Sequence, residues 1–227
     1  MTDVAVVDYG MGNLRSVAKA IEHVAPQLDV AVTSDPDTVM RAARVVFPGQ
    51  GAMPDCMREM DARGLRRAVL AAARDKPFLG ICIGLQMLFD ASEEGDVSGL
   101  GLLQGRVRRF PPAKMVDRQG TRLKVPHMGW NEVRQVAPHP LWEGIATASR
   151  FYFVHSYFPE PVSREVVAGE SDYGIPFTCA CARDNIFAVQ FHPEKSQAAG
   201  LRLLANFAAW RPAPRRAARA APAIPAA

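Results

Sequence analysis

Phe78-Leu79-Gly80-Ile81-Cys82-Ile83-Gly84-Leu85-Gln86 is the stretch that decides the fold of this 227-residue chain. Its first four residues are mostly apolar and follow Pro77, a pattern typical of a short buried strand. We expect Cys82 to occupy the turn after this strand, and a helix to begin there, whose start suits Leu85, Met87, Leu88 and Phe89. The two glycines of the stretch lack Cβ atoms and permit a tight turn with close neighbours. A thiol on such a strand-to-helix turn predicts a nucleophile.

Two consequences follow from a cysteine at this turn. The N-terminus of the following helix carries partial positive charge, which favours the thiolate over the thiol. The backbone N–H of Ile83 has no partner within the helix and can donate to a developing oxyanion. The alternative for Cys82 taken alone is a small buried residue that serves only packing.

A second segment supplies a base. Residues 185–191 predict a strand, and His192-Pro193-Glu194 follows it. Pro193 favours extended backbone at His192. The Glu194 carboxylate then comes within reach of the imidazole, where it would fix the tautomer and stabilise the imidazolium. The alternative is an ordinary turn with a solvated glutamate. Together with Cys82, these side chains are the minimum set for acyl transfer through a thioester.

Pro48-Gly49-Gln50-Gly51 follows a short apolar strand at 45–47. The two glycines allow the backbone to approach a ligand closely. In hydrolases with a nucleophile on this kind of turn, a second strand-end loop supplies the other oxyanion donor. The amide of Gln50 or Gly51 is the candidate, and a plain loop without a ligand is the alternative.

The first half of the chain alternates between predicted strands (4–8, 29–33, 45–47, 76–81) and helices (13–24, 36–43, 54–74). This order predicts a parallel sheet with helices on both faces and a ligand at the carboxyl ends of its strands, where Gly10, Gly49 and Cys82 fall. The second half predicts strands near 105–110, 120–125, 131–136, 150–155, 164–169, 176–181 and 186–191, then a helix over 197–210. The fold class is therefore α/β, with a central, largely parallel sheet flanked by helices and antiparallel strands in the C-terminal half.

The formal net charge of +4 comes from the end of the chain. Four arginines are the only charges beyond Trp210, which leaves 23 basic and 23 acidic residues in 1–210. We expect one domain over 1–210, a disordered Ala/Pro/Arg tail over 211–227 and no nucleic-acid partner. Basic residues also gather between Arg106 and Lys124, either as a solvated hairpin or as a face toward a partner with a phosphorylated substrate.

No signal peptide and no apolar run long enough to span a bilayer is visible, so we expect a cytoplasmic protein without a membrane partner. Cys179-Ala180-Cys181 lacks the second ligand pair of a zinc site, and reduced thiols are the simple interpretation. Gly10-Met11-Gly12-Asn13 lacks the third glycine of a dinucleotide motif, and no P-loop lysine follows. We therefore expect neither a metal nor a cofactor.

With these motifs in view, the chain resembles the class I glutamine amidotransferases over residues 3–208. Residues 48–51, 80–86 and 192–194 carry the resemblance. Residues 8–14, 126–131 and 191–196 are similar, more narrowly, to the branch of the family that serves histidine biosynthesis. The resemblance implies that glutamine is hydrolysed to glutamate and that ammonia passes to a cyclase partner, which is a (β/α)8 barrel, in a heterodimer.

The resemblance also implies roles for individual residues. Cys82 matches the nucleophile, His192 the general acid/base and Glu194 its orienting carboxylate, while Gly49 to Gly51 and Ile83 match the oxyanion site. The positions that hold glutamine match Gln86 and Glu94, with Glu93 next to the latter. The positions near the cyclase match Asn13, Trp130, Asn131, Tyr152 and Lys195. For Trp130 and Tyr152, packing in the core is the alternative.

Three other functions are compatible with parts of this pattern. A glutaminase could serve a pyridoxal-phosphate or aminobenzoate pathway synthase, although residues 8–14 and 126–131 weigh against that partner. A non-catalytic subunit could keep the fold, but it would be expected to lose Cys82, His192 or Glu194, and all three are present. A cysteine peptidase or amide hydrolase could act alone, and full-speed glutamate release without a partner would favour it.

Overall fold

A computed structural model describes residues 2–117 and 119–213. Its larger sheet begins with five parallel strands, in the spatial order β2 (Val30–Thr33), β1 (Val4–Val7), β3 (Arg44–Gly49), β4 (Phe78–Cys82) and β13 (Ile186–Val189). Four antiparallel strands extend it: β12 (Pro176–Arg183), β11 (Val167–Asp172), β8 (His127–Gln135) and β9 (Ser149–His155). The predicted α/β class, largely parallel in the first half and antiparallel in the second, is confirmed.

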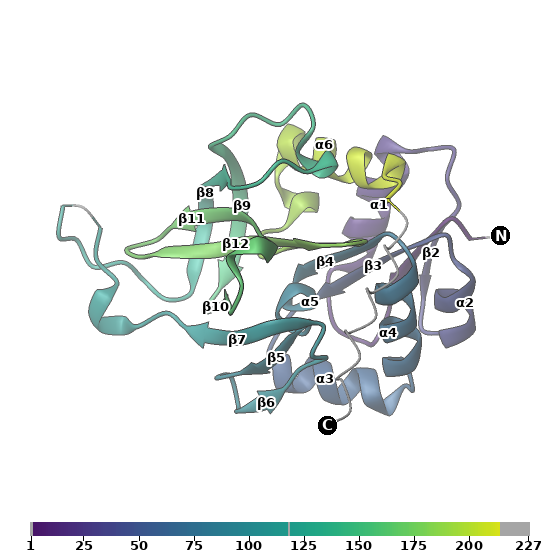
Figure 1. The fold of residues 1–227 in the computed structure, drawn as a ribbon, viewed down its shortest axis with the longest axis horizontal. Coiled ribbons are helices and arrows are strands. Elements are labelled where there is room, and N and C mark those ends of the chain that lie inside the picture. The colour runs from purple at the N-terminus through teal and green to yellow at the C-terminus, as the bar shows by residue number, and fades with distance from the viewer. Residues whose placement is uncertain (1, 118, 214–227) are drawn as a thin grey trace, which may run out of the picture.

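Helices cover both faces of the parallel half (Figure 1). On one face α1 (Leu14–Val24) packs with α6 (Gln197–Ala209), and on the other α2 (Pro36–Arg41) packs with α4 (Arg66–Asp75). The helix α3 (Met53–Ala62) precedes α4. Each follows from local sequence: α1 buries Val17, Ala18 and Ile21 at helical spacing, and the Asp35 carboxylate caps α2 by accepting from the N–H groups of its first turn.

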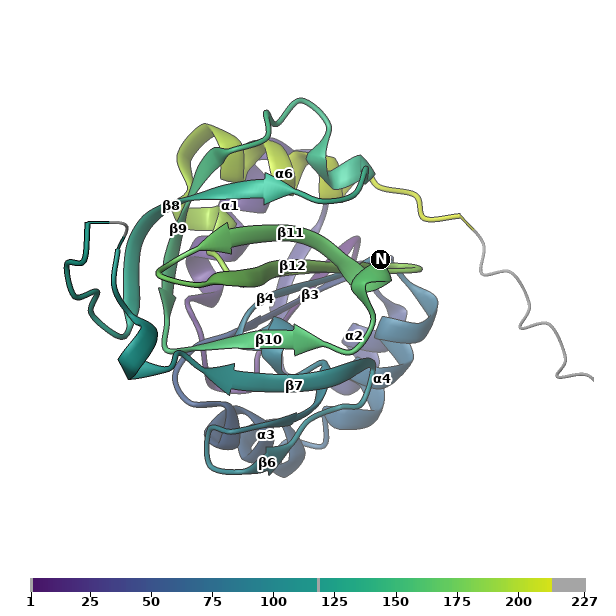
Figure 2. The ribbon, with the colours of Figure 1, turned by 60° about the vertical axis from the view of Figure 1, so that its left-hand side comes forward.

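A second, four-stranded sheet lies beside the larger one (Figure 2). Its strands are β10 (Tyr157–Pro161), β7 (Leu103–Arg109), β5 (Phe89–Ser92) and β6 (Val97–Ser98), in that order. Short 3-10 turns complete the described elements: η1 (Pro112–Lys114), η2 (Pro140–Trp142), η3 (Arg164–Val166) and η4 (Pro193–Lys195). Its first strand in the sequence, β5, begins seven residues after Cys82, whereas β10 comes from much later in the chain.

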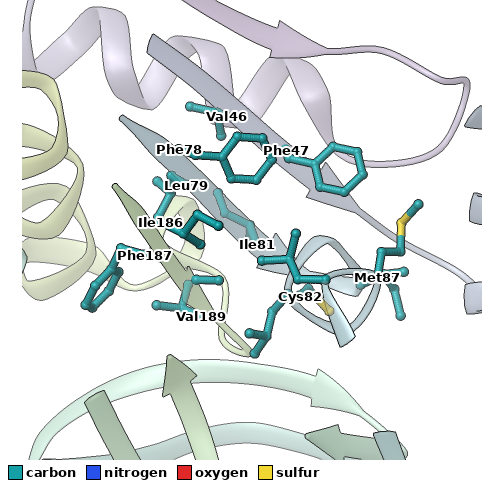
Figure 3. Close-up of a cluster of buried hydrophobic side chains, with 14 of the residues drawn as sticks. Val46, Phe47, Phe78, Leu79, Ile81, Cys82, Met87, Ile186, Phe187 and Val189 are labelled. Carbon is teal, nitrogen blue, oxygen red and sulfur yellow. The ribbon is translucent and has the colours of Figure 1, made fainter. Parts of the chain in front are cut away.

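The strand β13 joins the two halves of the larger sheet, because it is parallel to β4 and antiparallel to β12. Its register places Val189 opposite Ile81, and β3 places Gly49 opposite Cys82. The carboxyl ends of β3, β4 and β13 therefore coincide. Figure 3 shows Cys82 where β4 ends, next to a cluster of buried apolar side chains from these strands.

Three predictions of local structure are wrong. The helix expected over 54–74 is two helices, because the chain leaves the helical conformation at Gly64, whose φ is +68°. The helix start expected to include Phe89 is a single turn that ends at Gln86, and Phe89 instead starts β5 with its side chain fully buried. The strand expected at 120–125 is absent from the described residues there, which contribute one isolated bridge between Val116 and Arg122.

Within the described part of the chain, no helix combines the length and apolar character needed to cross a bilayer. Of the tail predicted over 211–227, residues 214–227 lie outside the described residues, as does Arg118 of the basic stretch.

Candidate active site

Cys82 lies on a tight turn between β4 and the one-turn helix α5 (Ile83–Gln86), as the sequence predicts. Its φ of 55° is in the left-handed region, which costs a non-glycine residue about 1–3 kcal/mol. The turn requires a glycine at position 84, where a Cβ atom would lie 1.8 Å from the carbonyl oxygen of Phe47. Positive φ at Cys82 and close packing behind it match the geometry of a nucleophile elbow.

The shortness of α5 corrects one part of the prediction. Four residues make a single turn, so the dipole of a long helix does not act on the Cys82 sulfur. The effect that remains comes from the first backbone N–H group of the turn. Ile83 is the first residue of the turn, and its N–H therefore has no partner within the helix.

His192 and Glu194 follow β13 and form a buried pair. The Nδ1 atom of His192 lies 2.9 Å from Oε1 of Glu194, and the carboxylate side chain is only 1% exposed. The backbone holds the imidazole in place, since the N–H of His192 donates to the Tyr152 carbonyl on β9 at 2.9 Å. The Ser196 hydroxyl donates to the His192 carbonyl at 2.6 Å.

The electrostatics of the site favour a charged imidazole. Burial is the largest single effect on His192 and lowers its pKa, but the charges and hydrogen bonds of Cys82 and Glu194 together outweigh it. The net result raises the pKa of His192 to about 10. The imidazole is therefore placed to stay protonated beside the Cys82 sulfur, an arrangement that would suit a cysteine nucleophile.

One cavity of about 310 Å³ brings the predicted residues together. This volume is at the lower end of the range for small-molecule sites, about 300–1,000 Å³. Its lining includes nearly all the side chains proposed for catalysis and substrate: Gln50, Gly51, Cys82, Ile83, Gln86, Glu94 and His192, with Lys195 from the predicted interface set. Glu194 stands behind His192, outside this lining.

Gly49 lies in β3 and is buried, so it does not line the cavity. A Cβ atom there would lie 2.6 Å from the Tyr9 hydroxyl and 2.7 Å from the Ile83 Cβ. The Tyr9 hydroxyl donates to the Pro48 carbonyl at 2.6 Å, and the Cys56 thiol donates to the Gln50 carbonyl at 3.4 Å. These hydrogen bonds fix the loop, and Gln50 and Gly51 line the cavity.

Gln86 and Glu94 have internal partners that fix their positions. The Gln86 amide nitrogen donates to the Tyr157 carbonyl and to Oε1 of Gln190, both at 3.1 Å. Its own carboxamide oxygen is buried and unpaired. One carboxylate oxygen of Glu94 accepts from the N–H of Met53 at 2.8 Å, at the start of α3. Glu93 points elsewhere, since it pairs with Arg108 and the N–H of Arg109.

The residues predicted for the cyclase interface come from several elements of the structure. Trp130 on β8 is 42% exposed and meets Tyr152 edge to face, with ring centroids 6.0 Å apart. Asn13 precedes α1, and Lys195 lines the cavity. The side-chain amide of Asn131 is committed internally, accepting from the N–H of Glu132 and donating to the carbonyl of Asp172.

Sequence reasoning missed several residues around the sulfur. The amide nitrogen of Gln190 lies 3.7 Å from Sγ of Cys82, and the carbonyl oxygen of Val154 lies 3.8 Å from it. Gln190 had a signal, because it lies in the strand predicted over 185–191, two residues before His192, where strand alternation would place both on one face. A backbone carbonyl such as that of Val154 has none.

The fold and the site together define a class of protein. The family described as "Glutamine amidotransferase class-I" matches residues 5–209, and the chain belongs to that family. More particularly, it is 72% identical over 212 residues to "Imidazole glycerol phosphate synthase subunit HisH" of Aromatoleum aromaticum, covering 93% of this chain and 100% of the relative. The protein of the same name from Nitrosospira multiformis is 68% identical, with the same coverage.

Solved structures agree on the fold. A protein from Thermoplasma acidophilum described as a putative GMP synthase subunit superimposes with a TM-score of 0.66 at 16% identity, covering 92% of this chain and 93% of that one. A structure described as a glutamine amidotransferase gives 0.67 at 16% identity, covering 92% and 100%.

Proposed function

We propose that this chain is the glutaminase subunit of an imidazole glycerol phosphate synthase. It hydrolyses glutamine through a thioester on Cys82 and passes the ammonia to a (β/α)8-barrel cyclase, its partner in a heterodimer of histidine biosynthesis. The observation that carries the proposal is the shared cavity, which holds the thiol and the imidazole in a chain that matches HisH relatives over their whole length.

The first half of the reaction forms the acyl-enzyme. The Cys82 thiolate attacks the carboxamide carbon of glutamine, and the oxyanion accepts hydrogen bonds from the N–H of Ile83 and from the amide of Gln50 or Gly51. Losing one such donor typically costs about 3–4 kcal/mol of transition-state stabilisation. The C–N bond then breaks as protonated His192 gives its proton to the departing nitrogen, which leaves as ammonia.

The second half releases glutamate. Neutral His192 takes a proton from water, the hydroxide attacks the thioester, and the C–S bond breaks to restore the thiolate–imidazolium pair. General acid/base assistance of this kind is worth roughly 10²–10⁴ in rate. Glu194 keeps Nδ1 of the imidazole occupied throughout, so that Nε2 is the atom that exchanges protons.

An obligate partner is consistent with the chemistry of the product. Ammonia released into water at neutral pH becomes ammonium, which is a poor nucleophile, and an enclosed path to the cyclase avoids this loss. The four cysteines are all free, as in proteins of a reducing compartment, and this supports a cytoplasmic location for the complex.

The basic stretch between Arg106 and Lys124 is partly neutralised within the chain. Arg106 lies 3.6 Å from Asp96, and Arg108 lies within 3.2 Å of carboxylate oxygens of Glu93 and Glu160. These pairs support the solvated hairpin for the β7 part of the stretch.

The direct test is glutamate production by the purified chain, with and without the cyclase and a ligand bound to the cyclase. We expect low turnover alone and a large increase in the complex. Full-speed hydrolysis by the isolated chain would favour an amide hydrolase that acts alone, and no hydrolysis in any mixture would refute the proposal.

Glu194→Gln is expected to lower kcat by about 10²–10⁴-fold, because a neutral amide no longer stabilises the imidazolium. Glu194 helps to raise the pKa of His192, so its loss lowers that pKa. The protonated imidazole is then lost at a lower pH, and the alkaline limb of kcat/KM moves to lower pH. Glu93→Gln, which alters an exposed ion pair, is the matched control. An unmoved alkaline limb in Glu194→Gln would contradict the assigned role.

Trp130→Ala is expected to weaken the complex with the cyclase. Trp130 and Met128 are large apolar side chains exposed on the same face of β8, at 42% and 61%. An aromatic anchor in a protein interface is worth about 2 kcal/mol or more, which is about a 30-fold change in Kd. Titration of the cyclase by calorimetry measures this, with Val162→Ala, exposed at the end of β10, as the control. Equal affinities for wild type and Trp130→Ala would remove Trp130 from the interface.

A further inference from the structure

Two buried imidazoles that the mechanism above does not use connect two cavities of the molecule. His155 lines the active-site cavity, and His127 lines a second cavity of about 510 Å³ together with Trp130 and Asn131. The Nδ1 atom of His127 lies 3.0 Å from Nε2 of His155. The two side chains are only 3% and 5% exposed, although each borders a cavity.

The contacts at the two ends of the pair extend it into a continuous chain. On the outer side, the amide nitrogen of Asn131 lies 3.4 Å from Nε2 of His127. On the inner side, Nδ1 of His155 lies 2.8 Å from the carbonyl oxygen of Tyr157. The same carbonyl accepts from the Gln86 amide. Hydrogen bonds therefore run from Asn131 on β8 to Gln86 in the active site.

The two ends fix the direction of every bond between them. The Tyr157 carbonyl can only accept, so Nδ1 of His155 must carry the proton and Nε2 must accept. At the other end, the N–H of Glu132 donates to the Asn131 carboxamide oxygen at 2.8 Å, which turns the NH₂ group of Asn131 toward His127. His127 then accepts at Nε2 and donates from Nδ1. Both rings are Nδ1–H tautomers, and every polar atom of both rings has a partner.

The surroundings keep the two rings neutral. His127 is stacked between Phe153 and Tyr173, with ring centroids 4.9 and 3.9 Å away. Burial lowers the pKa of His127 to about 4 and that of His155 to about 3. A neutral imidazole has one donor and one acceptor, so this series of hydrogen bonds can be fully formed in only one arrangement of the two rings. The two imidazoles do not act as acids or bases near neutral pH.

The inner end determines how the amide of Gln86, a residue that lines the cavity, is oriented. Its NH₂ group is held by two acceptors, the Tyr157 carbonyl and Oε1 of Gln190. Its carboxamide oxygen is consequently the free end, and it is buried without a partner. If this amide were rotated by half a turn, its NH₂ group would take the place of the oxygen. That NH₂ group would repel the N–H groups of a bound glutamine.

We propose that His127 and His155 are positioning residues for the substrate, which hold the Tyr157 carbonyl in place so that Gln86 presents an acceptor to an N–H group of glutamine. The proposal rests on the function proposed above, because it takes glutamine as the ligand of this cavity. It assigns the pair a role in substrate affinity and none in the chemical step. It also connects Asn131 to the site. The second N–H of the Asn131 amide donates to the carbonyl of Asp172.

The first test reads the tautomers directly. The chain has five histidines, so ¹⁵N-histidine labelling and long-range ¹H–¹⁵N spectra of the purified protein resolve each ring, with single His→Asn variants for assignment. Neutral Nδ1–H signals are expected for both His127 and His155 at pH 7. An Nε2–H tautomer or a charged ring at either position would overturn the proposal, whatever the glutaminase activity.

The second test separates affinity from turnover in the complex with the cyclase. His155→Leu removes the donor to Tyr157, and the KM for glutamine is expected to rise about tenfold with kcat within about threefold. His155→Asn keeps a donor at the position of Nδ1 and is expected to restore most of the affinity. His139→Leu removes a half-buried imidazole outside the cavity and controls for stability.

The outcomes of this test are distinct. If His155→Leu has an unchanged KM, or if kcat falls and KM does not rise, the positioning role is wrong. If His155→Leu does not fold, the positioning role is judged from two other results. These are the KM of His155→Asn compared with wild type and the tautomers of the two rings. If wild type hydrolyses no glutamine with the cyclase, the proposed function fails, while the tautomer result still stands or falls by itself.

Discussion

Cys82→Ala will abolish glutamine-dependent synthesis by the complex, with a loss of about 10⁴-fold or more, and will leave ammonia-dependent synthesis intact. Alanine supplies no nucleophile, so the thioester cannot form, and the oxyanion donors and bound substrate alone retain little catalysis. Ammonia supplied from solution bypasses this chain and reaches the cyclase directly. Parallel assays with glutamine and with an ammonium salt, at equal concentrations of complex, measure the two activities.

The matched control for Cys82→Ala is Cys181→Ala. Cys181 is a free cysteine on β12 that is fully buried, and burial raises the pKa of its thiol far from the range of a nucleophile. Its replacement removes one buried sulfur and should leave the ratio of the two activities unchanged. Substantial glutamine-dependent activity in Cys82→Ala would show that the thiol is not the nucleophile.

Gly84→Ala is expected to have the largest effect on the fold and to destroy the site with it. The new Cβ would lie 1.8 Å from the Phe47 carbonyl oxygen, and the neighbour is backbone, which cannot rotate away. Overpacking of this kind costs about 3 kcal/mol, so β3 and α5 must separate. For a domain of this size the melting temperature should fall by about 6–12 °C. Thermal unfolding followed by circular dichroism measures the change.

Gly64→Ala is the control for the glycine change. Its φ of +68° is unfavourable for alanine, but nothing lies within 4 Å of the Cβ that would be added. It should cost about 1 kcal/mol and leave glutaminase activity nearly unchanged. If Gly84→Ala were as stable and as active as Gly64→Ala, the close approach of Phe47 to the elbow would not be a requirement of the fold.

The parallel half of the fold could be predicted because its signals are local. These signals are apolar runs, helical spacing and glycine-rich ends, and each can be recognised in a window of about ten residues. Together they predict β1 to β4 in order. The errors arise where tertiary burial decides. Phe89 suits a helix or a strand equally, and it joins β5 because its side chain is buried there. The break at Gly64 differs from this, because a glycine with positive φ just after the last helical residues is a local signal for a helix end.

The same distinction separates the site residues that could be predicted from those that could not. Cys82, His192 and Glu194 could be found because catalysis needs particular side chains in recognisable local settings. His155 and the carbonyl of Tyr157 could not, because their positions depend on the pairing of β8 with β9 and of β10 with β7. A backbone carbonyl leaves no trace in the sequence, and a lone histidine in an apolar strand indicates nothing about its tautomer.

The pairing of β4 with β13 has a consequence for how the protein is made. His192 follows Cys82 by 110 positions, and at about 5–20 residues per second a ribosome needs roughly 5–20 s to translate that interval. During this time the nascent polypeptide already contains its thiol but no imidazole beside it. The thiol and the imidazole can meet only after β13, which lies between β4 and β12 in the sheet, has been made and has paired with β4.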